Sequence, residues 1–307
     1  MGSASRQIPE AAGISAAARE CGLSKESLRI WERRYGFPRP RRSPSGERLY
    51  GADQLEKLRL IKRLMDTGLA PRKLVGASVA QLRQMAAQAG AAAPAPAQHA
   101  DEIAAILQAL RERDVARLRA RLRRQLARLG TRAFVIELAA PLAEHVGAAW
   151  ARGDIGIAQE HLFSEQLESL LRSAGTPAHA EAEGPAVLLA TLPGEQHRLG
   201  LLMLEALLAG EGAACIPLGT QTPVAEIALA AQASRVAVVA LSFSAAFPRR
   251  AALRGLAELR ARLPASIAVW AGGGALRGAR KRVEGVVMPM TLESALAELP
   301  KRLARAA

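Results

Sequence analysis

One glutamate and one histidine stand close together in the segment TLPGEQHRLG, residues 191–200, where their spacing suits metal binding. Glu195 lies two residues before His197 and could accept a hydrogen bond from one ring nitrogen of the imidazole. Such a pairing fixes the ring tautomer and raises the basicity of the other nitrogen, as a metal-ligating histidine requires. The alternative is a loop histidine that is exposed to solvent or purely structural.

A second group of polar and aromatic residues lies in the segment WARGDIGIAQEH, residues 150–161. Trp150 precedes a break that contains two glycines, and Glu160 and His161 follow it. The break should fold the two flanking helices together, so that these three side chains come close to one another. The alternative for Trp150 is a place in the core of a helical bundle.

The Glu195–His197 pair is expected at the edge of a parallel sheet. Over residues 184–307, apolar runs such as AVLLATL and VAVVALSF alternate with helical segments, which predicts an α/β Rossmann-like, doubly wound parallel sheet. A short basic helix is expected between IAVWAGG and GVVM. Ligands bind such sheets at the carboxyl ends of the strands, where His197 should lie.

Residues 101–180 are expected to form a four-helix bundle. Their apolar residues recur at helical spacing, and short loops separate the segments. Asp114 and Asp154 are placed to cap the second and fourth helices, while Gly130 and Gly153 are placed to end the second and third.

Residues 1–88 carry the pattern of an all-α winged helix-turn-helix domain, and the Ala/Pro tract at 89–100 is expected to be a linker. Ser15 could cap a first helix, Gly22 could make the turn, and Ser24 could cap a basic second helix suited to the major groove. The segment PRPRRSPSGERLY that follows predicts a stiff basic hairpin, a wing that lies along DNA phosphates.

Charge and composition agree with a nucleic-acid partner. The formal net charge is +14, and residues 1–75 hold 16 Lys and Arg against 8 Asp and Glu. The alternative is that an Arg-rich chain is basic without a functional reason. Cys21 and Cys215 are the two cysteines, which excludes a disulfide scaffold or a cysteine-ligated zinc site. Because no apolar run reaches about 18 residues and no signal-peptide core is evident, a cytoplasmic protein is expected.

The string SLRIWERRYGFPRP…SGERLY resembles the winged helix of the MerR family of transcription regulators, over about residues 10–78. The resemblance implies binding of double-stranded operator DNA. It implies DNA-facing roles on the helix for Ser24, Lys25, Arg29, Trp31, Arg33, Arg34 and Tyr35, and on the wing for Arg41, Arg42, Arg48 and Tyr50. Leu28 and Trp31 could instead be core residues.

The pattern Glu-x-His-x-x-Gly after a strand resembles the DxHxxG signature of cobalamin-binding domains, with Glu in place of Asp. It implies that His197 is the lower axial ligand of cobalt, with Glu195 and Gly200 beside it. Ser242 resembles the family's strand-ending serine, and Ser244 stands where the family has leucine. The glycines that would leave room for the nucleotide tail are Gly272, Gly273 and Gly274. An ordinary tight turn is the alternative for these glycines.

The domain order, the length and the spacing of Trp150 from Glu160 and His161 resemble the light-sensing cobalamin regulators of the CarH and LitR type. The resemblance implies adenosylcobalamin, with its adenosyl group covered by these three residues. It also implies a homotetramer that represses from its operator in the dark and releases DNA when light breaks the cobalt–carbon bond. Such regulators often carry His directly after this Trp; Ala151 stands here, so a photoproduct locked by two histidines is not expected.

Two other functions stay open. A MerR-type regulator could sense cobalamin, or a protein partner, without light. A corrinoid carrier in methyl transfer would share the His197 loop but gives no reason for a winged helix. The sequence shows no Ser-His-Asp arrangement, paired-carboxylate motif or P-loop, so an enzyme is not expected.

Overall fold

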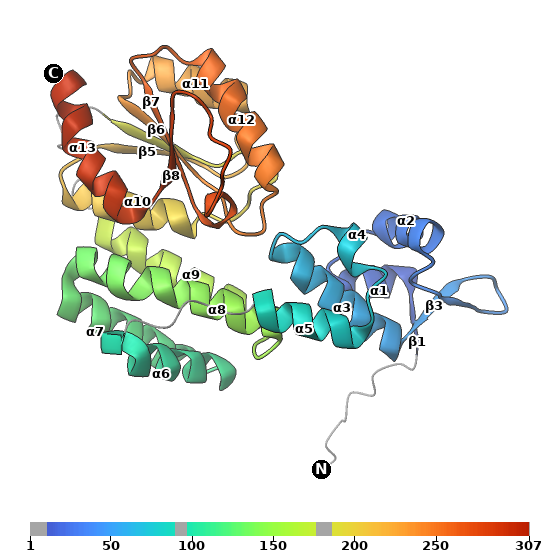
Figure 1. Ribbon diagram of the computed structural model, residues 1–307. Helices are drawn as coiled ribbons and strands as arrows, with labels where there is room; N and C mark the ends of the chain where they lie inside the picture. The colour runs from blue at the N-terminus through green and yellow to red at the C-terminus, as the bar shows by residue number, and fades with distance from the viewer. Residues whose placement is uncertain (1–10, 90–96, 176–185, 307) are drawn as a thin grey trace. The chain divides into compact units, whose positions relative to one another are not determined.

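The computed structural model describes residues 11–89, 97–175 and 186–306 (Figure 1). The chain divides into two compact units, Met1–Ala89 and Gly90–Ala307, which are described separately. Most of the expected linker lies outside the described residues, as do residues 176–180 at the end of the expected bundle. Residues Ala97–His99, inside the expected linker, form a short 3-10 helix (η1).

The first unit combines a helix-turn-helix with a small antiparallel sheet. Its helices are α1 (Ile14–Cys21), α2 (Lys25–Tyr35), α3 (Ala52–Asp66), α4 (Pro71–Leu74) and α5 (Val79–Ala89). The strands β1 (Ala11–Gly13), β2 (Arg41–Arg42) and β3 (Arg48–Gly51) pair in the order β1-β3-β2. The β2–β3 hairpin confirms the predicted wing, whereas the strand β1 was not predicted.

Helix boundaries in the first unit follow local backbone chemistry. Gly22 adopts the left-handed conformation that ends α1, and the Ser24 hydroxyl accepts a hydrogen bond from the Ser27 amide at 2.9 Å, so both predictions are confirmed. The predicted cap at Ser15 is wrong. Extended Gly13 ends β1 and leads directly into α1 at Ile14, which leaves Ser15 inside the helix.

The second unit begins with four main helices. These are α6 (Ala100–Arg111), α7 (Val115–Ala133), α8 (Ala140–Arg152) and α9 (Ile157–Gly175), with a π-helical turn, η2 (Phe134–Ala139), between α7 and α8. Asp114 caps α7 by accepting from the Arg117 amide at 2.9 Å, as predicted. Gly130 and Gly153 have positive φ angles of 72° and 87°, which break the helix and end α8 respectively.

The predicted cap at Asp154 is wrong. Its carboxylate accepts from the Arg152 guanidinium at 2.8 Å. The following helix, α9, starts three residues later, and the Gln159 side chain accepts from the Gly156 amide at 2.7 Å just before it.

A five-stranded parallel sheet completes the second unit, in the order β5-β4-β6-β7-β8. The strands are β4 (Val187–Ala190), β5 (Cys215–Gly219), β6 (Val238–Ser242), β7 (Ala268–Gly272) and β8 (Val286–Met290), and the helices are α10 (Leu199–Gly210), α11 (Val224–Ala233), α12 (Arg249–Arg262) and α13 (Leu292–Ala306). Alternate residues of the strands enter two hydrophobic cores, one with α10 and α13 and the other with α11 and α12. Helices therefore cover both faces, which confirms the predicted doubly wound sheet.

The crossover from β7 to β8 differs from the prediction. A 3-10 turn, η3 (Gly274–Leu276), replaces the expected basic helix, and residues 277–285 form no regular secondary structure. Gly278 has a φ of +65°, a left-handed conformation that interrupts a right-handed helix.

The helical bundle packs on the sheet domain through α10. Helix α9 lies alongside α10 (Figure 1), and one hydrophobic core joins Phe134 and Leu167 of the bundle with Leu204 of α10 and Trp270 of β7. Burial of this apolar surface stabilises the contact between the two layers. Among the described residues, no helix is both long enough and apolar enough to cross a membrane.

Candidate functional site

Glu195 and His197 lie on the loop that joins the carboxyl end of β4 to α10. The Glu195 side chain is 1% exposed, and one of its oxygens lies 2.7 Å from His197 Nδ1 and 2.9 Å from the His197 amide. The other oxygen accepts from the amide and the hydroxyl of Ser244, at 2.7 and 2.8 Å. The structure therefore brings the predicted pair together and adds Ser244 from the loop after β6.

The electrostatics of this loop keep Glu195 ionised. Burial raises the pKa of Glu195, but the hydrogen bonds from His197 and Ser244 outweigh it and hold the pKa below its ordinary value. A carboxylate accepts hydrogen bonds and cannot donate them, so His197 Nδ1 carries the proton and Nε2 is the nitrogen suited to a metal. The His197 side chain is 62% exposed, which leaves the ring accessible to a large ligand.

The predicted residues Gly200 and Ser242 meet beside this loop. A Cβ atom at Gly200 would lie 2.5 Å from the Ser242 hydroxyl, so the first turn of α10 packs closely on the end of β6. Gly273 has a φ of +99°, and a Cβ there would lie 2.2 Å from the Phe243 carbonyl. Gly272 and Gly274 are similarly close to Met290 and Ala245. All four glycines thus permit close backbone packing along the carboxyl edge of the sheet.

The residues expected on the opposite side of the cofactor lie on α8 and α9. Trp150 is half-buried and packs against the core shared by the bundle and the sheet. His161 Nδ1 lies 2.9 Å from Glu160, and Ser164 donates to the same carboxylate at 2.9 Å. The His161 side chain is 69% exposed. Two of the three predicted side chains are therefore in direct contact.

Ala151, directly after Trp150, is buried and has no ligating atom. The nearest preceding histidine on this helix, His145, has its Nδ1 at 2.8 Å from the Pro141 carbonyl. This arrangement agrees with the expectation that position 151 supplies no second histidine.

Two ion pairs that the sequence analysis did not single out join the bundle to the carboxyl edge of the sheet. Arg198, the residue after His197, contacts the almost fully buried Glu168 of α9 at 2.5 Å. Arg277, after β7, contacts Glu144 of α8 at 2.5 Å. Each glutamate raises the pKa of its arginine by hydrogen bonding. The adjacency of Arg198 to His197 is the one sequence signal that could have drawn attention to the first pair.

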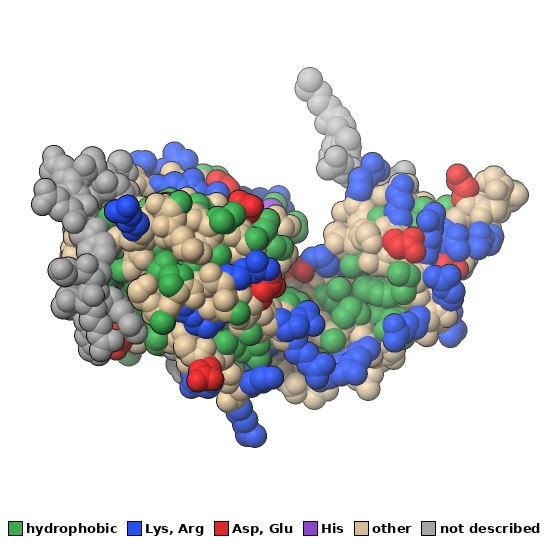
Figure 2. Space-filling view, turned by 90° about the horizontal axis from the view of Figure 1, so that it is seen from above, with side chains coloured by type: hydrophobic (Ala, Val, Ile, Leu, Met, Phe, Trp, Pro, Cys, Tyr) green, Lys and Arg blue, Asp and Glu red, His purple; other side chains and the backbone are tan. Residues whose placement is uncertain are grey.

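The basic face of α2 is exposed as the sequence predicted. Leu28 and Trp31 are buried in the core of the first unit, so the DNA-facing role considered for Trp31 is wrong. The exposed cations of α2 are Lys25, Arg29, Arg33 and Arg34. Lys and Arg side chains are prominent on the face seen in Figure 2.

Four further residues expected to face DNA have different surroundings. Ser24 caps α2, and Tyr35 is half-buried with the Arg34 guanidinium 5.5 Å from its ring centroid. Arg48 is half-buried and pairs with Glu32 at 2.7 Å. Tyr50 is fully buried, so its expected DNA contact is wrong: in β3 it pairs with Ala12 and turns its side chain into the core.

The wing itself presents two exposed cations. Arg41 and Arg42 form β2, and the Arg42 guanidinium donates to the Gly46 carbonyl at 2.9 Å, which closes the turn. Both remain available at the hairpin for phosphates.

The chemistry of the donor set fits a metal that brings its own ligands. Among the described residues, no group of three or more His, Cys, Asp or Glu side chains could hold a metal ion. A single imidazole backed by a buried carboxylate suits a metal whose other positions are filled by a macrocycle. A cobalt corrin meets this requirement.

Comparisons with known proteins agree with this geometry. Residues 13–78 match the family model of the MerR HTH family regulatory protein, while residues 102–173 and 185–299 match two models of a B12 binding domain. The HTH-type transcriptional repressor CarH of Myxococcus xanthus is 34% identical over 271 residues, covering 86% of this chain and 89% of the relative. The repressor CarA of the same organism is 31% identical and covers 75% of each chain.

Solved structures show the same fold in the second unit. The monomethylamine corrinoid protein of Methanosarcina barkeri aligns with a TM-score of 0.50 and 17% identity, covering 64% of this chain and 96% of that chain.

Proposed function

The chain belongs to the CarH family of MerR-type regulators with B12-binding domains, and from this premise we propose that it is an adenosylcobalamin-dependent repressor that light releases from DNA. Transcription regulation, DNA binding and cobalamin binding follow from the family. The adenosyl form, the response to light and the homotetramer are the proposed part.

The observation that carries the proposal is the Glu195–His197 pair at the sheet edge that the bundle contacts. His197 would hold cobalt through Nε2, and Glu195 would keep the ring in the required tautomer. Ser242, Gly200 and the glycines at 272–274 line the edge where the nucleotide tail would enter. When bound, adenosylcobalamin supplies a cobalt–carbon bond that visible light breaks.

The bundle residues would sense the group on the other side of the cofactor. Trp150, Glu160 and His161 would cover it, and their contacts would differ between the two states of the ligand. The ion pairs Arg198–Glu168 and Arg277–Glu144 hold α9 and α8 against the sheet edge, so a change there would reach the surfaces that join subunits.

One observation favours a second candidate, a regulator that senses cobalamin without light. Buried Ala151 offers no second axial ligand for a vacated cobalt position. The light-exposed state would then be easily reversed, and the amount of cobalamin would set the fraction of repressor on DNA.

The test uses the full-length protein loaded with adenosylcobalamin in the dark, and a duplex selected from a random pool by that protein. We expect a His-ligated cobalt spectrum, a tetramer by light scattering, and loss of both tetramer and DNA binding after illumination. Hydroxocobalamin, which lacks the adenosyl group, is the control. A His197→Ala variant with an unaltered spectrum would remove the ligand assignment, and DNA binding that is equal in dark and light would leave the second candidate.

A further inference from the structure

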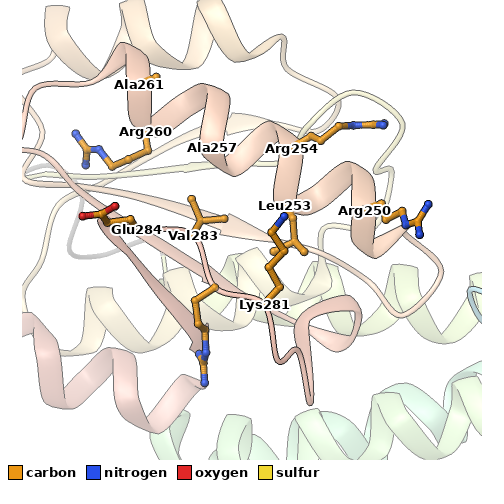
Figure 3. A pocket seen from close by; sticks show the side chains of 10 residues that line it. Arg250, Leu253, Arg254, Ala257, Arg260, Ala261, Lys281, Val283 and Glu284 are labelled. Atoms are coloured by element: carbon orange, nitrogen blue, oxygen red, sulfur yellow. The ribbon is translucent and has the colours of Figure 1, made fainter.

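A basic groove of about 900 Å³ runs along α12, away from the residues assigned above (Figure 3). It exists because the β7–β8 crossover contains no regular helix: residues 281–284 run beside α12 and leave a channel between them. Arg250 and Arg254 of α12 line one wall, and Lys281 and Arg282 line the other. Leu253 and Val283 contribute apolar surface between the walls (Figure 3).

The positive charge of this groove is not compensated. Within the described ranges, the exposed side chains of Arg250, Arg254, Lys281 and Arg282 make no hydrogen bond or ion pair. A further arginine of the groove, Arg260, is occupied, since it donates to the backbone carbonyls of residues 263, 264 and 267. Glu284 is the acidic side chain among the lining residues. The groove therefore attracts an anion that reaches both walls.

The shape of the groove selects among anions. Arg250 and Arg254 are one helical turn apart, about 6 Å along the axis, so the cations form an extended row rather than a single point. A sugar–phosphate strand places phosphates along such a row and sugars against apolar side chains. A compact acid would engage one end of the groove only.

DNA is also the polyanion that this chain brings to itself. The helix-turn-helix lies in the same polypeptide, so DNA held there is present at a high effective concentration for any other basic surface. We propose that the α12 groove binds the phosphate backbone of duplex DNA that flanks the sequence read by α2. The proposal rests on the DNA binding assigned above and adds a second contact surface to it.

The experiment compares two full-length variants that lose equal charge. Arg250→Gln with Arg254→Gln removes one wall of the groove, and Arg123→Gln with Arg124→Gln removes two exposed arginines of α7 that also make no hydrogen bond or ion pair in the described structure. The probe is the selected duplex, extended by random sequence on both sides. Its affinity is measured between 50 and 200 mM salt.

We expect the groove variant to bind more weakly at low salt and to show a shallower salt dependence. Each lost phosphate contact reduces the slope of log affinity against log salt by about 0.9, so two contacts change the wild-type advantage about tenfold across this range. The α7 variant should keep the wild-type slope. On a duplex trimmed to the selected core, the groove variant and the α7 variant should bind equally.

Equal slopes for the two variants on the extended duplex would overturn the proposal and would point to an acidic protein as the occupant. Failure of the proposed function gives a different result. In that case the wild-type chain itself fails to bind DNA, or binds without dependence on Arg33 and Arg34 of α2.

Discussion

Replacing Glu195 by Gln should prevent His197 from presenting Nε2 to a metal. Each Glu195 oxygen accepts two hydrogen bonds, from His197 on one side and from Ser244 on the other. The amide of Gln puts an NH₂ group on one of these sides, where a backbone N–H then loses its acceptor. If the NH₂ faces His197, the ring must accept at Nδ1 and carry its proton on Nε2, which blocks ligation.

The structure sets the size of the effect. One hydrogen bond to a charged group contributes about 1.5–3 kcal/mol, and its loss corresponds to a 10–100-fold rise in the Kd for cobalamin. The same range applies to partners that orient a metal-ligating histidine, typically about 10–100-fold. The Glu195→Gln variant should therefore still bind cobalamin, but weakly and with a reduced His-ligated fraction.

The assay is an absorbance titration of the dark protein with adenosylcobalamin, which reports affinity and axial ligation together. Glu226→Gln, an exposed position on α11, is the matched control and should titrate like the wild type. Thermal unfolding of both variants without cofactor checks that the fold is kept. Wild-type affinity and an unaltered His-ligated spectrum in Glu195→Gln would refute the orienting role of this carboxylate.

Further predictions concern stability and reactivity. Because the pKa of Glu195 is lowered by folding, its stabilising contribution is present above its ordinary value of 4.5 and is lost as pH falls through the lower folded value; acid unfolding of the wild type, but not of Glu195→Gln, should show this component. Glu168→Ala should lower the free energy of unfolding by about 2 kcal/mol, because it removes the buried partner of Arg198, and exposed Glu165→Ala by less than about 0.5 kcal/mol; urea titration measures both. Ser24→Ala should cost about 1 kcal/mol, read from loss of helix in the first unit by circular dichroism, since it removes the cap of α2. Burial raises the pKa of Cys215 to about 12, so Ellman's reagent should label it at pH 8 only after unfolding.

Local chemistry made part of the fold predictable. Gly22, Gly130 and Gly153 mark helix ends because only glycine adopts positive φ without a Cβ clash, and the structure confirms all three breaks. The alternation of apolar strands and helices likewise predicted the doubly wound sheet. Gly278 shows the limit of this reasoning, because its left-handed conformation breaks a segment whose composition favoured a helix.

The site was predictable only where its partners are close in sequence. Glu195 and His197 are two residues apart, and their contact was expected. Ser244 joins them from 49 residues away and Glu168 from 30 residues before Arg198, which no local pattern indicates. The burial of Tyr50 was missed because β3 has only four residues, too few for alternation to show which face is inward.

Consecutive residues of one loop answer to different layers of the protein. The ring of His197 is steadied by a carboxylate of its own sheet, while the next guanidinium, that of Arg198, is anchored in the neighbouring helical layer. A single peptide bond thus couples them mechanically. Tilting the imidazole cannot be absorbed locally, because it pulls on α9 through its neighbour, and the loop works as a short lever between a ligand and the helices above it.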